Sequence, residues 1–73
     1  MSGFNGYKLL AARTRSGMSR MDLAKAIGFL VGPESIGRYE RDEITKPGFD
    51  VVRAMAMALK VPIEDLEDNA ESF

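Results

Sequence analysis

Two charged side chains between residues 34 and 38 have the chemistry to read a base pair. A guanidinium such as that of Arg38 can donate two hydrogen bonds to O6 and N7 of guanine. The carboxylate of Glu34 can accept a hydrogen bond from N4 of cytosine, although a solvated carboxylate is equally natural near the start of a helix. Arg38 follows Ile36 by two residues. In a helix it therefore lies about 200° around the axis from that apolar side chain, on the outward face with Glu34.

The composition argues against catalysis and metal binding. The 73 residues include neither cysteine nor histidine, which removes thiolate ligands, disulfides and the commonest general base. The remaining Asp, Glu, Lys and Ser residues form no recognisable catalytic constellation. We therefore expect a protein that is not an enzyme, holds no metal and needs no cofactor or small-molecule ligand.

The net charge of −1 hides a strong asymmetry along the chain. Residues 1–60 contain all ten Lys and Arg against six acids, a balance of +4, whereas residues 61–73 contain five acids and no base, a balance of −5. The basic part can meet a phosphate backbone while the acidic end faces away. A solvated acidic tail that keeps the protein in solution would give the same pattern.

Residues 19–40 are predicted to form two short helices joined by a turn. Ser19 is a good N-cap, and Asp22 three residues later completes a capping-box pattern. Gly28 can end the first of these helices, and Gly32-Pro33 opens the second. A short second helix with an apolar inner stripe and a polar outer face is how a helix-turn-helix presents itself to DNA.

The other elements are predicted to be helical as well, which gives an all-α fold of five short helices. The further helices cover about 5–15, 49–60 and 63–68, and in the second of these Phe49, Val52, Met55, Ala56 and Leu59 are expected to face the core. No strand signal is present, and residues 1–5 are expected to be loose. We expect a single domain over 1–73 with an ordered core at about 6–66 and an acidic tail at 67–73.

The combined spacing of these residues resembles the Cro/repressor class of helix-turn-helix DNA-binding domains. The resemblance covers about residues 6–66 and is carried by Arg13, Gly17, Ser19, Leu23, Ala24, Gly28, Ile36, Tyr39, Glu40, Lys46, Pro47, Phe49, Ala56 and Leu59. One departure is clear, because the segment from Gly28 to Ile36 is two residues longer than usual in the family. Either the helix that begins after Ser19 runs longer, or the turn that follows it bulges.

The resemblance implies roles for particular side chains. The residues that match major-groove positions are Glu34, Ser35 and Arg38, and those that match phosphate-binding positions are Ser19, Arg20, Arg41, Thr45 and Lys46. Arg13 and Glu40 match a structural ion pair between two helices. For any one of the phosphate-binding candidates, a merely solvated surface residue is equally plausible, and Asp42 and Glu43 weaken the expected positive potential.

Two apolar groups are harder to place. Phe29, Leu30 and Val31 occupy the lengthened turn, where we expect them to extend the core, with a partner contact as the alternative. Met57, Val61 and Pro62 stand near the end of the helix at 49–60, beside a second apolar stripe at Val51, Ala54 and Ala58. The resemblance implies a dimer contact near that corner.

The function expected from the sequence is that of a cytoplasmic, Cro-like transcriptional repressor, since no second domain follows. It would bind double-stranded DNA as a homodimer on a pseudo-palindromic operator, and no segment is long and apolar enough to span a membrane. The alternative is a protein-interaction module on the same fold, such as an antitoxin or an antirepressor-like adaptor. The acids Glu34, Asp42 and Glu43 near the expected DNA face favour that alternative.

Overall fold

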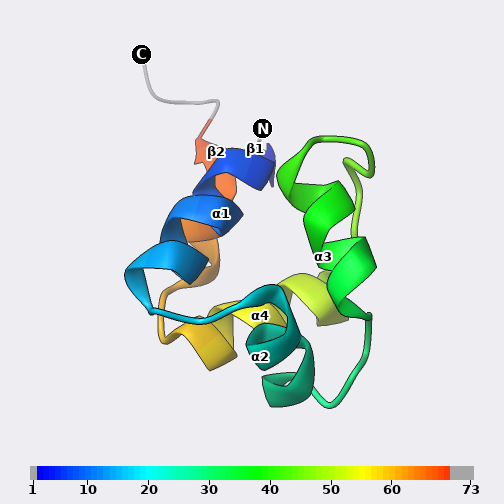
Figure 1. Cartoon of the computed structure of the whole chain (residues 1–73). Coiled ribbons are helices and arrows are strands. Elements are labelled where there is room, and N and C mark those ends of the chain that lie inside the picture. Colours follow the sequence, from blue (N-terminus) through cyan, green and yellow to red (C-terminus); the bar gives the residue numbers. More distant parts are fainter. Residues whose placement is uncertain (1, 70–73) are drawn as a thin grey trace.

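Four α-helices and one 3-10 turn pack around a shared apolar core in the computed structural model, which describes residues 2–69 (Figure 1). In chain order the elements are β1 (Ser2–Phe4), α1 (Gly6–Arg15), α2 (Arg20–Ala26), α3 (Pro33–Glu40), α4 (Phe49–Leu59), η1 (Ile63–Leu66) and β2 (Glu67–Asn69). The expected helical class is confirmed. The fifth helix is the single 3-10 turn η1, and it ends two residues before the predicted boundary.

The core takes one large, fully buried side chain from each helical element. These side chains are Leu9, Leu23, Ile36, Met55 and Leu66, and none of them is measurably exposed. Burying an aliphatic side chain of this size stabilises a fold by about 1.5–3 kcal/mol. Ile36 therefore fixes the rotation of α3 about its own axis, and the outer face of α3 is defined by that anchor.

Local sequence sets where three of the helices begin. The Asn5 side chain accepts a hydrogen bond from the backbone N–H of Lys8 at 3.1 Å and caps α1. Ser19 and Asp22 form the predicted capping box at the start of α2, with both reciprocal bonds present. Pro33 occupies the first turn of α3, where its missing N–H costs nothing.

A short antiparallel ribbon was not predicted. β1 pairs with β2 in the register Ser2↔Asn69, Gly3↔Asp68 and Phe4↔Glu67. The expectations of a loose N-terminus and of a free tail from residue 67 were therefore wrong for residues 2–4 and 67–69. Three-residue strands are too short to show an alternating pattern, and they form here because the helices bring the two segments together. Met1 and residues 70–73, which complete the expected loose ends, lie outside the described residues.

The lengthened segment before α3 forms a bulged turn. α2 ends at Ala26, and two successive residues in the turn, Gly28 and Phe29, have left-handed backbone conformations with φ of 65° and 56°. The chain consequently swings away from the core. The prediction that the turn extends the core was wrong for Phe29 and Leu30, which are 55% and 53% exposed, whereas Val31 does pack against the core.

The prediction that Phe49 faces the core was also wrong. It is the first residue of α4 and is 67% exposed, although Val52, Met55, Ala56 and Leu59 of the same predicted stripe are buried. Side chains lean toward the N-terminus of their helix. From the first position of α4, Phe49 therefore extends beyond the end of the core.

Candidate nucleic-acid interface

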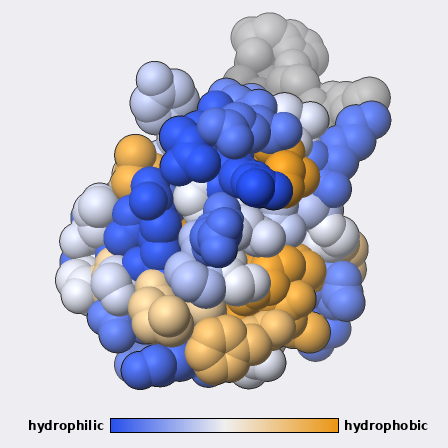
Figure 2. Space-filling model, turned by 45° about the vertical axis from the view of Figure 1, so that its right-hand side comes forward, coloured by the Kyte–Doolittle hydropathy of each residue, from blue (hydrophilic) through white to orange (hydrophobic). Residues whose placement is uncertain are grey.

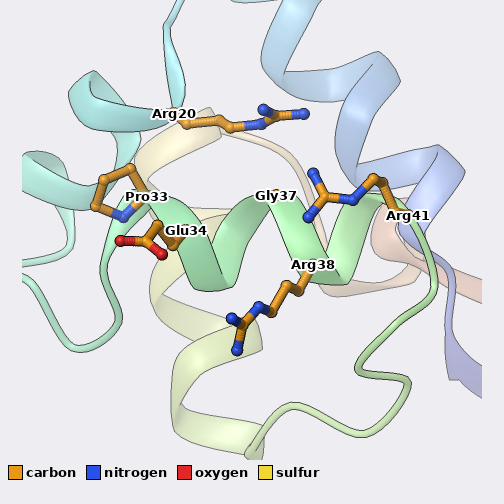
Figure 3. Close-up of a pocket in the computed structure, with 6 residues that line it drawn as sticks. All are labelled: Arg20, Pro33, Glu34, Gly37, Arg38 and Arg41. Atoms are coloured by element: carbon orange, nitrogen blue, oxygen red, sulfur yellow. The ribbon is translucent and has the colours of Figure 1, made fainter.

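The outer face of α3 and the start of α2 enclose an open hollow of about 330 Å³ (Figure 3). Its lining residues are Arg20, Pro33, Glu34, Gly37, Arg38 and Arg41. Three of these six residues carry a guanidinium and one carries a carboxylate. The hollow is therefore a cationic surface on the face of α3 opposite its buried anchor Ile36.

Two of the three base-reading candidates line this hollow. Glu34 and Arg38 are exposed and leave the same side of α3, whereas Ser35 is half-buried and does not line the hollow (Figure 3). Within residues 2–69, Arg38 forms no ion pair, not even with Glu34 one turn earlier on the same face. The guanidinium of Arg38 is thus available to a ligand.

Only two of the five phosphate-binding candidates line the hollow. Arg20 and Arg41 lie in the hollow, at the start of α2 and the end of α3. Ser19 precedes Arg20, and its hydroxyl accepts the capping hydrogen bond at 2.9 Å. Thr45 and Lys46 are exposed in the loop before α4, outside the hollow. They follow the end of α3 along the chain but do not belong to the residues that line the hollow.

Arg13 and Glu40 form the expected pair between α1 and α3. Arg13 Nε donates to Glu40 Oε2 at 2.6 Å and Arg13 Nη2 donates to Oε1 at 3.1 Å, while Nη1 donates to the Met18 carbonyl oxygen at 2.8 Å. The Glu40 side chain is 1% exposed and that of Arg13 is 12% exposed. The pair therefore ties α1, the loop after it and the end of α3 into one unit.

Arg20 is a third member of this network, and the sequence analysis missed it. Its Nε donates to Glu40 Oε1 at 3.0 Å, and its side chain remains 43% exposed. One buried carboxylate thus serves two guanidiniums. Arg20 and Glu40 are 20 residues apart in the sequence, so no local pattern could distinguish Arg20 from the other exposed bases.

Arg41 is held by an acid that the sequence analysis treated as unfavourable. Arg41 Nε donates to Glu43 Oε2 at 2.8 Å, and about half of each side chain is exposed. The hydrogen bond from Arg41 lowers the pKa of the Glu43 carboxyl, and the same bond raises the pKa of Arg41. Glu43 is therefore ionised and engaged at neutral pH.

The three residues expected at a dimer contact lie on α4 and just after its end. Met57 is 68% exposed, Val61 is half-buried and Pro62 is exposed. The second apolar stripe of α4, at Val51, Ala54 and Ala58, packs partly against the core. The exposed apolar surface of this helix is thus narrower than the sequence pattern indicated.

Residues 2–69 bring no three acidic side chains together in a way that would hold a metal ion. None of the described helices has the length and apolar character needed to cross a bilayer.

Comparison with known proteins identifies the family. A helix-turn-helix family model matches residues 9–66. This chain is a helix-turn-helix protein of the Cro/C1 type. A search of curated protein sequences finds no match. Among solved structures, this helix-turn-helix chain is similar to the phage P22 c2 repressor, crystallised with synthetic operator 9T in the presence of Tl⁺. The two are 28% identical with a TM-score of 0.73, over 84% of this chain and 88% of the repressor chain.

Proposed function

We propose that this protein is a sequence-specific transcriptional repressor that places α3 in the major groove of double-stranded DNA. The observation that carries the proposal is the cationic outer face of α3, where Arg38, which has no ion-pair partner among residues 2–69, stands between Glu34 and Arg41. Arginine is the side chain best suited to guanine, and arginines beside it can bind the flanking phosphates. The likeness to a repressor solved on its operator supports the same function.

The distribution of charge over the fold supports this orientation. The described acids that follow α4 belong to η1 and β2, which lie on the α1 side of the molecule in Figure 1. Figure 2 shows hydrophilic residues over much of the upper part of this view, with apolar patches to the right and below. DNA approaching α3 would meet the basic part of the chain.

We further propose that the 6–66 region acts as one domain and pairs with a second copy on a pseudo-palindromic operator, through Met57, Val61 and Pro62. Repression would follow from occupancy of the operator. On this proposal the protein carries out no chemical step and needs neither cofactor nor small-molecule ligand. A protein that acts on chromosomal DNA would work in the cytoplasm of a bacterial host.

The test is binding of the purified protein to genomic fragments, with and without competitor DNA, at several salt concentrations. We expect specific fragments to be retained. The logarithm of the binding constant should fall linearly with the logarithm of salt concentration, with a slope of about −0.9 for each phosphate contacted. A binding constant that does not change between low and physiological salt would contradict a DNA-binding function.

A second candidate function is a protein-interaction module on the same fold. The exposed side chains of Phe29 and Leu30 beside the start of α3 favour it, because neighbouring apolar side chains in water often mark a partner contact. A protein of this kind would bind duplex DNA weakly and without sequence preference. The binding experiment on genomic fragments therefore separates the two functions.

A further inference from the structure

Two guanidinium groups lie over the backbone of Gly37 in the middle of the hollow. A Cβ atom at residue 37 would stand 3.1 Å from Arg41 Nη1 and 3.3 Å from Arg20 Cζ. Figure 3 shows the two side chains reaching toward each other above α3, one from α2 and one from the end of α3. The absence of a side chain at Gly37 thus allows two cations to share one small area of the surface.

Two guanidinium groups that approach the same point above Gly37 repel each other, so other contacts must hold both groups in place. Each arginine uses its Nε to bind a carboxylate: Arg20 binds Glu40 at 3.0 Å, and Arg41 binds Glu43 at 2.8 Å. The Nη groups form no hydrogen bond with the described part of the chain. They remain free to donate to an anion above Gly37.

The two carboxylates differ in one important respect. Glu40 is buried and also binds Arg13, so its position is fixed by the core of the fold. Glu43 is half exposed, and Arg41 is its ion-pair partner among residues 2–69. Its backbone N–H donates to the Arg38 carbonyl oxygen at 2.8 Å, which fixes the loop that carries it against the end of α3.

We propose that Glu43 is a positioning residue, which holds Arg41 beside Arg20 over Gly37 so that the two guanidiniums bind a single phosphate group. This inference rests on the proposed function, because the phosphate would belong to the DNA backbone. Glu43 would then strengthen DNA binding despite its negative charge. A carboxylate that only repels phosphate would weaken it.

Asp42 provides a matched control, because it is the adjacent exposed acid and forms no ion pair within residues 2–69. Binding of Asp42→Asn and Glu43→Gln to the same duplex would be measured by fluorescence anisotropy. We expect Asp42→Asn to bind more tightly than the wild type. Glu43→Gln should bind about twofold to fivefold more weakly, the range that corresponds to loss of an exposed ion pair. Equal tightening in both variants would overturn the positioning role.

Gly37→Ala tests directly whether Arg20 and Arg41 bind one phosphate group above residue 37. Alanine favours a helix more than glycine does, so the variant should fold at least as stably as the wild type. Its methyl group would occupy the space above residue 37, 3.1 Å from Arg41 Nη1 and 3.3 Å from Arg20 Cζ, where the phosphate is proposed to bind. We expect weaker DNA binding and a salt slope smaller in magnitude by about 0.9, as for one lost phosphate contact. An unchanged slope together with unchanged affinity would exclude a phosphate at this position.

A measurement without DNA separates this inference from the proposed function. Inorganic phosphate would be titrated at constant ionic strength while the Nε–Hε NMR signals of the arginines are followed. We expect the signals of Arg20 and Arg41 to shift together, more than that of Arg53 on α4, and the Arg41 shift to shrink in Glu43→Gln. Shifts no larger than that of Arg53 would overturn the anion site. Failure of DNA binding with these shifts intact would instead overturn the repressor function.

Discussion

Arg13 and Arg20 both bind Glu40, but the two arginines differ in burial and should differ in their importance for stability. Arg13→Ala would leave a 1%-exposed carboxylate without its main partner. Breaking a buried pair in this way costs roughly 3–5 kcal/mol of unfolding free energy. Arg20→Ala should cost at most about 1 kcal/mol, because 43% of the Arg20 side chain is exposed.

Urea denaturation of the wild type and both variants measures this difference. The midpoint for Arg13→Ala should fall well below that for Arg20→Ala. Equal midpoints would mean that the buried carboxylate is satisfied by either arginine, and that Arg13 does not fix the end of α3.

Arg38 and Lys46 should affect DNA binding in different ways. Arg38 forms no ion pair with the described part of the chain and lies on the outer face of α3, so Arg38→Ala should lose about 1–3 kcal/mol at the operator and relax the preference for guanine at one position in each half-site. Lys46 lies in the exposed loop before α4. Lys46→Ala should weaken binding to all sequences alike and reduce the magnitude of the salt slope by about one.

A binding selection over randomised half-sites, carried out with the wild type and both variants, gives the answer. Should Arg38→Ala keep the base preference and merely bind everything more weakly, Arg38 would be a phosphate contact. The bulged turn would then have rotated α3 from the orientation we propose.

At the scale of the elements, the capping box of α2 should make stability depend on pH. Two hydrogen bonds with Ser19 lower the pKa of Asp22 below its usual value of 3.8. A depressed pKa in the folded state means that the stabilisation is complete above pH 3.8 and is lost as the pH falls through the folded-state pKa. Asp22→Asn should therefore melt below the wild type at neutral pH, and the two melting temperatures should converge in acid.

Ser19→Ala serves as the companion variant. It removes the other half of the box and should cost about 1 kcal/mol at neutral pH, and this difference should also narrow in acid because the Ser19 side chain helps to lower the pKa of Asp22. Thermal melts followed by circular dichroism at several pH values provide both comparisons. A difference between Asp22→Asn and the wild type that persists unchanged into strong acid would show that the carboxylate does not support the cap.

The bulged turn before α3 stores backbone strain at Phe29. A bulky residue with φ of 56° is unfavourable, whereas glycine adopts that conformation freely. Phe29→Gly should therefore raise the unfolding free energy by up to about 1 kcal/mol, after allowing for the greater freedom of glycine in the unfolded chain. Leu30 is equally exposed but does not have a positive φ.

Leu30→Gly is accordingly the matched control, and it should lower stability by about 0.5–1 kcal/mol. Chemical denaturation of the two variants compares them directly. If both glycines destabilise the protein to the same extent, the Phe29 side chain contributes packing that outweighs its strain.

These elements also show which parts of the fold can be predicted from the sequence. The boundaries of α1, α2 and α3 depend on caps and on Pro33, which act within a few residues and can be recognised locally. The exposure of Phe49, the direction of the bulged turn and the β1–β2 pairing depend on how distant segments meet. No local pattern carries that information, and all three were predicted wrongly or left open.

In the candidate site, too, some features can be predicted from the sequence and others depend on tertiary packing. The exposed positions of Glu34 and Arg38 follow from helical periodicity relative to Ile36. The contacts of Arg20 with Glu40 and of Arg41 with Glu43 join residues whose geometry is decided by tertiary packing and by the loop after α3. They could not be distinguished beforehand from ordinary surface charges.

For the whole molecule, the proposed dimer predicts a specific effect at Met57. Met57 is 68% exposed, so Met57→Lys should leave the fold intact. If α4 supports pairing, the variant should bind a full operator less tightly while its affinity for an isolated half-site is unchanged. Tyr7→Lys, which alters a residue of α1 that is 75% exposed, is the control and should change neither affinity.

Sedimentation of the protein with the operator DNA reports the stoichiometry. A two-to-one complex that survives Met57→Lys unchanged would place the pairing surface elsewhere on the molecule.

The pairing of β1 with β2 closes the path of the chain into a ring. Gly3 lies opposite Asp68, and the backbone N–H of Asn5 donates to the Leu66 carbonyl oxygen at 2.8 Å, so the described ends meet at one corner of the molecule (Figure 1). A ring has no preferred starting point. The strands could be joined by a short linker and the chain opened in the exposed loop before α4, and the same core could still assemble. The order of the elements along the chain is therefore less essential to this fold than the contacts between them.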